Sequence, residues 1–87
     1  MCFSLEQNYP NPFNPSTTIR FSLPAQTNLK INIYNMLGEL VKTLSEGTFE
    51  PEYYNVTFNA AELSSGTYIY RIESEKFRES RKMTLLR

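Results

Sequence analysis

The stretch Gln7-Asn8-Tyr9-Pro10-Asn11-Pro12-Phe13-Asn14-Pro15-Ser16-Thr17-Thr18-Ile19 holds three of the five prolines of this 87-residue chain. Proline fixes φ and biases the residue before it towards extended geometry, which excludes a helix here. Asn11 and Asn14 precede prolines, and their amides can bond to nearby backbone. We therefore predict a stiff, extended segment whose two rings, Tyr9 and Phe13, close a small β-domain rather than form a ligand platform.

Alternation of polar and apolar residues predicts the strands that follow this stretch. Strands are expected over residues 18–23, 29–34, 40–44, 52–58, 67–73 and 77–86. The first two runs, joined by a short polar link, predict a β-hairpin, and residues 45–48 predict a turn. The inward faces are expected to carry Ile19, Phe21, Leu23, Leu29, Ile31, Ile33, Tyr54, Val56, Phe58, Tyr68, Tyr70, Ile72, Met83 and Leu85. No segment supplies the crossover helix that parallel strands need, so the sequence predicts an all-β fold. Its expected form is a small immunoglobulin-like antiparallel β-sandwich of about seven strands.

Three local features refine this prediction. Gly38 lies in a turn that is expected to need a positive φ. Residues 59–63 are too short for a full helix and predict one helical turn capped by Asn59. Leu63-Ser64-Ser65-Gly66-Thr67-Tyr68 has the order of a tyrosine corner, in which the Tyr68 hydroxyl would bond back to upstream backbone where the chain crosses between sheets.

Histidine and aspartate are absent from the chain, and all nine acidic residues are glutamate. Without histidine there is no general base that titrates near neutrality and no imidazole metal ligand. Glu50 with Glu52, and Glu73 with Glu75, are paired carboxylates, but each pair lies in or beside a polar turn where charge is normally solvated. The composition therefore predicts a protein that is not an enzyme and that uses no metal or other cofactor.

Positive charge is concentrated at the C-terminal end of the sequence. Residues 76–87 hold five cations and one glutamate, a net charge of +4, whereas the other residues carry −4. Such a basic strand can bind an acidic partner, or it can guard a sheet edge against unwanted pairing. The chain has no basic, aromatic nucleic-acid surface and no apolar run of about 18 residues, so we expect neither a nucleic-acid partner nor a transmembrane segment.

Four blocks of sequence, in order, resemble the type A C-terminal sorting domains of the type IX (Por) secretion system. These domains occur on exported proteins of Bacteroidetes and related phyla. The blocks are residues 5–19, 33–38, 63–70 and 82–87. The matching signature residues are Tyr9, Pro10, Asn11, Pro12, Phe13, Asn14, Pro15 and Gly38, followed by Gly66 and Tyr68. The chain departs from the pattern at Glu52, where many members have glycine, and at Phe58-Asn59, where Trp-Asp or Phe-Asp is common.

The resemblance implies a single β-sandwich domain, residues 1–87, that follows an N-terminal cargo domain in a larger secreted protein. Such domains are recognised by the outer-membrane translocon and its shuttle protein, and a cell-surface sortase removes many of them. The cargo is then secreted or held at the cell surface after transit through the periplasm. A related immunoglobulin-like domain occurs in the flagellar hook-capping protein.

The resemblance also places the residues that the receptor is expected to read. They are Lys82, Met83, Leu85, Leu86 and Arg87 in the terminal strand, together with Gly66 and Tyr68. An alternative function is an accessory sandwich module that binds carbohydrate, through exposed tyrosines such as Tyr53, or that stabilises a neighbouring enzyme domain.

Overall fold

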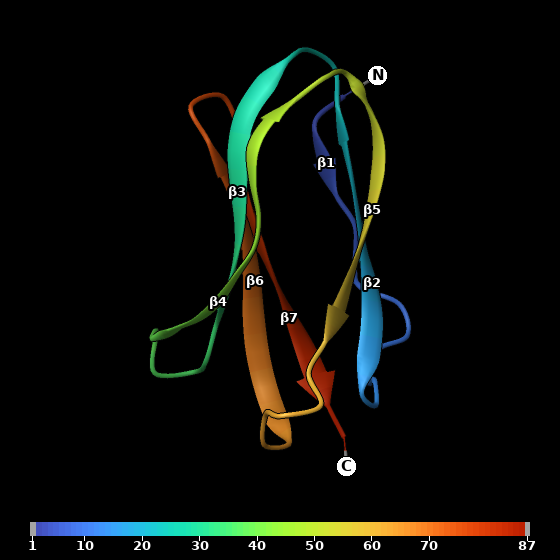
Figure 1. The fold of residues 1–87 in the computed structure, drawn as a ribbon, viewed down its shortest axis with the longest axis vertical. Helices are drawn as coiled ribbons and strands as arrows, with labels where there is room; N and C mark the ends of the chain where they lie inside the picture. The colour runs from blue at the N-terminus through green and yellow to red at the C-terminus, as the bar shows by residue number, and fades with distance from the viewer. Residues whose placement is uncertain (1, 87) are drawn as a thin grey trace.

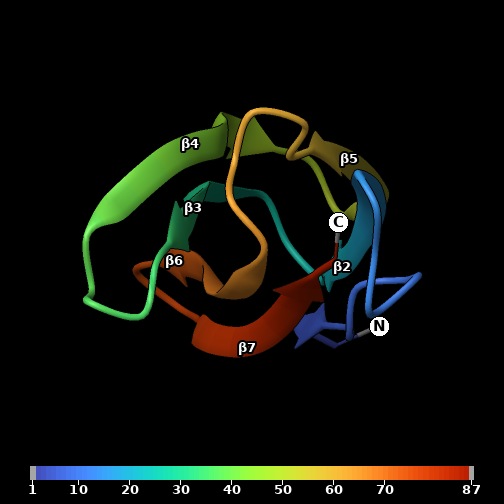
Figure 2. The ribbon, with the colours of Figure 1, turned by 90° about the horizontal axis from the view of Figure 1, so that it is seen from below.

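The computed structural model describes residues 2–86 and forms a sandwich of two antiparallel sheets (Figure 1). The strands are β1 (Ser4–Leu5), β2 (Ser16–Leu23), β3 (Thr27–Tyr34), β4 (Leu40–Phe49), β5 (Glu52–Asn59), β6 (Gly66–Ser74) and β7 (Arg78–Leu85). One sheet has the order β1-β2-β5 and the other the order β4-β3-β6-β7. Figure 2 shows the two sheets wrapped around a common interior. The predicted all-β sandwich of seven strands is confirmed.

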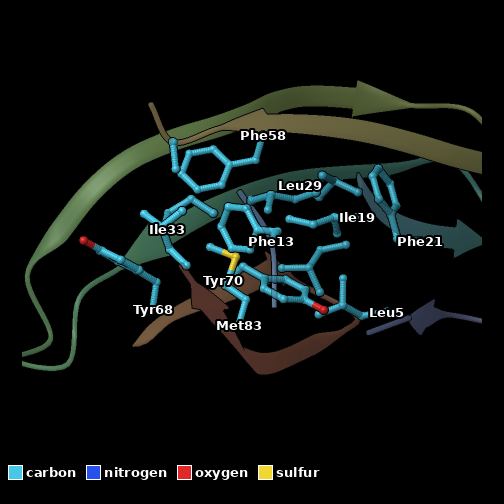
Figure 3. Close-up of a cluster of buried hydrophobic side chains, with 14 of the residues drawn as sticks. Leu5, Phe13, Ile19, Phe21, Leu29, Ile33, Phe58, Tyr68, Tyr70 and Met83 are labelled. Atoms are coloured by element: carbon cyan, nitrogen blue, oxygen red, sulfur yellow. The ribbon is translucent and has the colours of Figure 1, made fainter. Parts of the chain in front are cut away.

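The interior is filled by the apolar residues that alternate along the strands (Figure 3). The buried core consists of Leu5, Phe13, Ile19, Phe21, Leu23, Leu29, Ile31, Ile33, Phe58, Ala60, Tyr68, Tyr70, Ile72, Met83 and Leu85. The predicted inward faces are thus confirmed, with Tyr54 and Val56 only half-buried on β5. Large aromatic rings supply much of the buried area that so short a chain needs.

The predicted hairpin between the first two long strands is wrong. β2 pairs with β1 and β5, whereas β3 pairs with β4 and β6, so the link between them crosses from one sheet to the other. Alternation shows which side of a strand faces the core, but it does not show which strand lies beside it. A short polar link that contains Pro24 fits a crossing between facing sheets as well as it fits a hairpin.

The turn predicted over residues 45–48 is also wrong, because β4 continues through it to Phe49. The chain turns instead at Glu50 and Pro51. Two register shifts between β3 and β4 leave Val41 and Leu44 without a partner on β3, and both side chains pack against the core. β4 is an edge strand, and bulges of this kind protect a sheet edge from pairing with other chains.

The predicted turns elsewhere are confirmed. Gly38 has a φ of 82°, in the left-handed region that favours glycine. Asn59 Oδ1 accepts the backbone N–H of Ala61 at 2.9 Å and caps a single turn. The Tyr68 hydroxyl donates to the carbonyl oxygen of Ser64 at 2.7 Å, where the chain passes from β5 to the other sheet. This is the hydrogen bond of a tyrosine corner.

Candidate functional site

The segment between β1 and β2, residues 6–15, ties the two sheets together, and we call it the clasp. It begins beside β2, where Glu6 N donates to Arg20 O at 2.9 Å. It then reaches β7 in the opposite sheet, where a parallel bridge joins Phe13 to Leu85. The segment is not extended as predicted, because the backbones of Tyr9 and Thr18 pair in both directions and close a loop.

The two rings of the clasp have different environments. Phe13 is 2% exposed and lies 6.3 Å from the ring of Phe58, as predicted for an anchor (Figure 3). Tyr9 is 81% exposed, so its predicted role as a second anchor is wrong. The inward positions of the clasp belong to Phe13 and to the buried side chain of Asn8.

A buried polar contact fixes the start of the clasp to β6. The Tyr70 hydroxyl donates to Glu6 O at 2.6 Å and accepts the N–H of Asn8 at 2.8 Å. The Asn8 amide in turn donates to Thr17 Oγ1 at 2.9 Å and to Pro10 O at 3.1 Å. Burial raises the pKa of the Tyr70 phenol to about 12, because the charged form would lose its hydration. Alternation along the strand predicted Tyr70 in the core but not its contact with Asn8, since no spacing rule connects residues 62 apart.

The clasp covers the outer edge of β7 along its C-terminal half. Phe13 N donates to Thr84 O at 3.0 Å, and Leu86 N donates to Phe13 O at 2.9 Å. Asn11 Oδ1 accepts the N–H of Thr84 at 2.9 Å, so its amide bonds to a distant strand rather than to nearby backbone. Gln7 Nε2 donates to Lys82 O at 2.7 Å. β7 is the edge strand of its sheet, but a receptor strand could add along residues 82–86 only by displacing the clasp.

The predicted recognition residues of β7 divide between surface and core. Lys82 and Leu86 are exposed, whereas Met83 and Leu85 are fully buried. Arg87 lies outside the described residues. The buried pair is therefore not accessible to a partner while the strand keeps its place in the sheet.

Gly66 and Tyr68 support the same strand from β6. Gly66 lies opposite Leu85 in the sheet, and Tyr68 lies opposite Met83. Tyr68 is buried and Gly66 is exposed. The structure thus brings these two predicted residues beside the terminal strand.

Loops that carry signature residues, distant in sequence, lie towards the same end of the sandwich. The β1–β2 loop, the β3–β4 turn that contains Gly38, the β5–β6 link and the C-terminal end of β7 all lie towards the lower end in Figure 1. We call this part the signature end, formed by residues 9–15, 35–39, 60–66 and 82–86. The β6–β7 turn lies at the opposite end, where the ring of Phe3 stacks on that of Phe77 at 5.2 Å.

The β3–β4 turn places apolar side chains in solvent. Leu37 is 84% exposed, and Met36 and Leu40 are also largely exposed. Asn35 Oδ1 accepts the N–H groups of Leu37 and Glu39 at 2.9 and 3.0 Å and so fixes the turn. The sequence predicted the turn but not its exposed apolar surface.

The cations of the basic stretch have different roles. Lys76, Arg78 and Lys82 are exposed. Arg81 is half-buried, where its Nε donates to Leu5 O at 2.7 Å and its guanidinium pairs with Glu79 at 3.3 Å. Arg81 therefore joins β7 to the opposite sheet, and among the described cations of this stretch Lys76, Arg78 and Lys82 are accessible to an external partner.

The remaining candidate sites have no distinctive geometry. Glu52 Oε1 accepts the N–H of the adjacent Tyr53, and Glu73 accepts the hydroxyl of Tyr34. Tyr53 is exposed, and the guanidinium of Arg20 lies 5.4 Å from its ring centre and covers one face of the ring. Within residues 2–86 no three acidic or cysteine side chains are grouped to hold a metal ion.

The sequence matches the family described as secretion system C-terminal sorting domain over residues 7–85. The chain belongs to this family. As a type IX sorting domain it is a C-terminal secretion signal, a non-catalytic kind of domain that interacts with the type IX secretion machinery, and its protein is secreted or at the cell surface. No curated protein matches the sequence. Across residues 2–86 the sorting domain has no helix that is long and apolar enough to cross a membrane.

Proposed function

We propose that the signature end is the surface that the outer-membrane translocon and its shuttle protein read, with the end of β7 as the main contact. The observation that carries this proposal is that the β1–β2 loop, the β3–β4 turn, the β5–β6 link and the end of β7, which all carry signature residues, lie towards the same end of the sandwich. The core alone does not require this arrangement, because most of the segment from Tyr9 to Pro15 is exposed. Exposed loop residues that face the same end of a domain are suited to recognition by a partner.

Lys82 and Leu86 make the contact, and Arg87 extends it. Strand alternation turns Met83 and Leu85 into the core and so directs their neighbours outwards. The charge of Lys82 can steer the encounter with the receptor, and the apolar side chain of Leu86 can be buried in the contact.

The whole chain, residues 1–87, acts as one domain that follows a covalently linked cargo domain, and a cell-surface sortase removes it. The contact of Phe3 with Phe77 places the start of the described chain at the end opposite the signature end. A cargo that precedes the domain would leave from there, clear of the recognition surface. The receptor and the cargo junction are then accessible at the same time.

The test is a reporter protein fused in front of residues 1–87 in a host with type IX secretion. A Lys82→Gln, Leu86→Gln double variant removes two exposed side chains and leaves the core intact, unlike deletion of residues 82–87, which removes Met83 and Leu85 as well. We expect surface reporter to fall about tenfold or more, since loss of a main contact costs at least about 1.4 kcal/mol of binding. The matched control is Arg78→Gln, an exposed cation at the other end of β7. Normal surface delivery of the folded double variant would contradict the proposal.

A further inference from the structure

We propose that the place occupied by Phe13 on β7 is an exchangeable binding site for an extended segment of another protein, which pairs with β7 in parallel and inserts one aromatic ring. The clasp itself shows what this site accepts. Phe13 N and O both bond to β7, to Thr84 O at 3.0 Å and to Leu86 N at 2.9 Å, and the bridge to Leu85 is parallel. This is the pattern by which an added strand joins a sheet edge.

One side chain anchors this part of the clasp. Between Tyr9 and Pro15, Phe13 is buried and every other residue is exposed. Its ring lies in the core against Phe58, at 6.3 Å between centres. An incoming segment therefore needs one aromatic residue to fill the same space, with polar or proline neighbours that tolerate solvent.

Opening this part of the clasp leaves the rest of the fold in place. The loop is fixed on one side by the paired backbones of Tyr9 and Thr18, and on the other by the bond from Ala60 N to Pro15 O at 2.9 Å. Between these points the hydrogen bonds with β7 are the two backbone bonds of Phe13 and the bond from Thr84 N to Asn11 Oδ1, and the Phe13 ring adds its packing in the core. Release of Phe13 therefore frees the edge of β7 from Thr84 to Leu86 without separating the sheets.

The clasp and the incoming segment compete for one site. The apparent affinity for the segment is its intrinsic affinity multiplied by the fraction of molecules whose clasp is open. A substitution that weakens the clasp raises this fraction and therefore tightens binding, although it removes contacts from the domain.

The test uses a fluorescent synthetic peptide with the sequence of residues 8–16 and the full 87-residue chain, with binding followed by fluorescence polarisation. We expect Phe13→Ala in the chain to tighten binding of the peptide by about tenfold or more relative to the unaltered chain. A peptide with alanine at the position of Phe13 should bind neither chain. Tyr9→Ala in the chain is the matched control, because this exposed ring in the same segment does not fill the site.

If Phe13→Ala fails to fold, Asn11→Ala decides the question, because it removes one bond to β7 and keeps the ring. It should tighten peptide binding about fivefold, which corresponds to the roughly 1 kcal/mol of one hydrogen bond. Folded variants that bind the peptide no better than the unaltered chain would overturn the proposal. A dimer of the unaltered chain with exchanged clasps would also overturn it, because the clasp of a second copy, and not a segment of another protein, would then occupy the site.

Discussion

Replacing Tyr70 with phenylalanine tests whether the clasp depends on the buried hydroxyl. The substitution keeps the ring and removes an oxygen that donates to Glu6 O at 2.6 Å and accepts from Asn8 N at 2.8 Å. A hydrogen bond contributes about 1 kcal/mol net, and a buried group left unpaired costs about 1–3 kcal/mol. Asn8 is buried and cannot turn to water, so we expect Tyr70→Phe to lower the free energy of unfolding by about 2–3 kcal/mol.

This loss is large compared with the total free energy of unfolding, which is expected to be roughly 4–13 kcal/mol for a domain of this size. Urea unfolding, followed by far-UV circular dichroism, measures it as a lower midpoint with an unchanged slope. Tyr68→Phe is the matched control: it removes one bond, to Ser64 O in an exposed link, and should cost about 0.5–1 kcal/mol because water can replace the partner. Equal losses in the two variants, or a loss below about 1 kcal/mol for Tyr70→Phe, would refute the reasoning.

Three further predictions concern stability. Phe13→Ala should cost about 3–5 kcal/mol in the same unfolding assay, because it leaves a cavity beside Phe58, and a loss below about 1 kcal/mol would mean that the ring is dispensable. Gly38→Ala should cost about 1–2 kcal/mol from its positive φ alone, since an added Cβ meets no atom within 4 Å; an unchanged midpoint would contradict this. The pKa of Tyr70 is raised from 10.0 to about 12 in the folded chain. The stability that depends on its protonated hydroxyl is therefore present in full below pH 10 and is lost as the pH rises from 10 to 12. The stability difference between the unaltered chain and Tyr70→Phe should therefore shrink by about 1.4 kcal/mol per pH unit in that range, and a constant difference would argue against the shift.

The sequence predicted the faces of the strands better than their partners. Alternation identified Ile19 and Phe21 on β2, and Ile31 and Ile33 on β3, as core residues, because a period of two follows directly from strand geometry. It could not reveal that these strands lie in facing sheets, since an inward face looks the same in either arrangement. The turn expected near Gly47 failed for a related reason: small and polar residues are typical of turns, but they are also typical of an exposed edge strand.

The candidate site was predictable in its members but not in its contacts. The signature residues were identified by resemblance, and the burial of Phe13 followed from its apolar character. Tyr9 has the same character and is exposed, because the backbone of the clasp turns only Asn8 and Phe13 inwards. The bond from Thr84 N to Asn11 spans 73 residues, and no local pattern in the sequence encodes a contact of that range.

The clasp and the terminal strand form one structural unit, and this changes how deletions should be interpreted. Phe13 bonds to Thr84 and Leu86, so the N-terminal signature completes the sheet at the point where the C-terminal signature ends. Deletion of the clasp uncovers the edge of β7, and deletion of the end of β7 removes the strand to which the clasp bonds. A truncated domain that fails to sort would therefore not reveal which of the two segments the receptor reads. Substitutions separate the two roles: Lys82 and Leu86 can be changed on the surface while Phe13 stays in the core. A sorting defect in such a variant, with the unfolding midpoint unchanged, would therefore assign recognition to the strand and closure to the clasp.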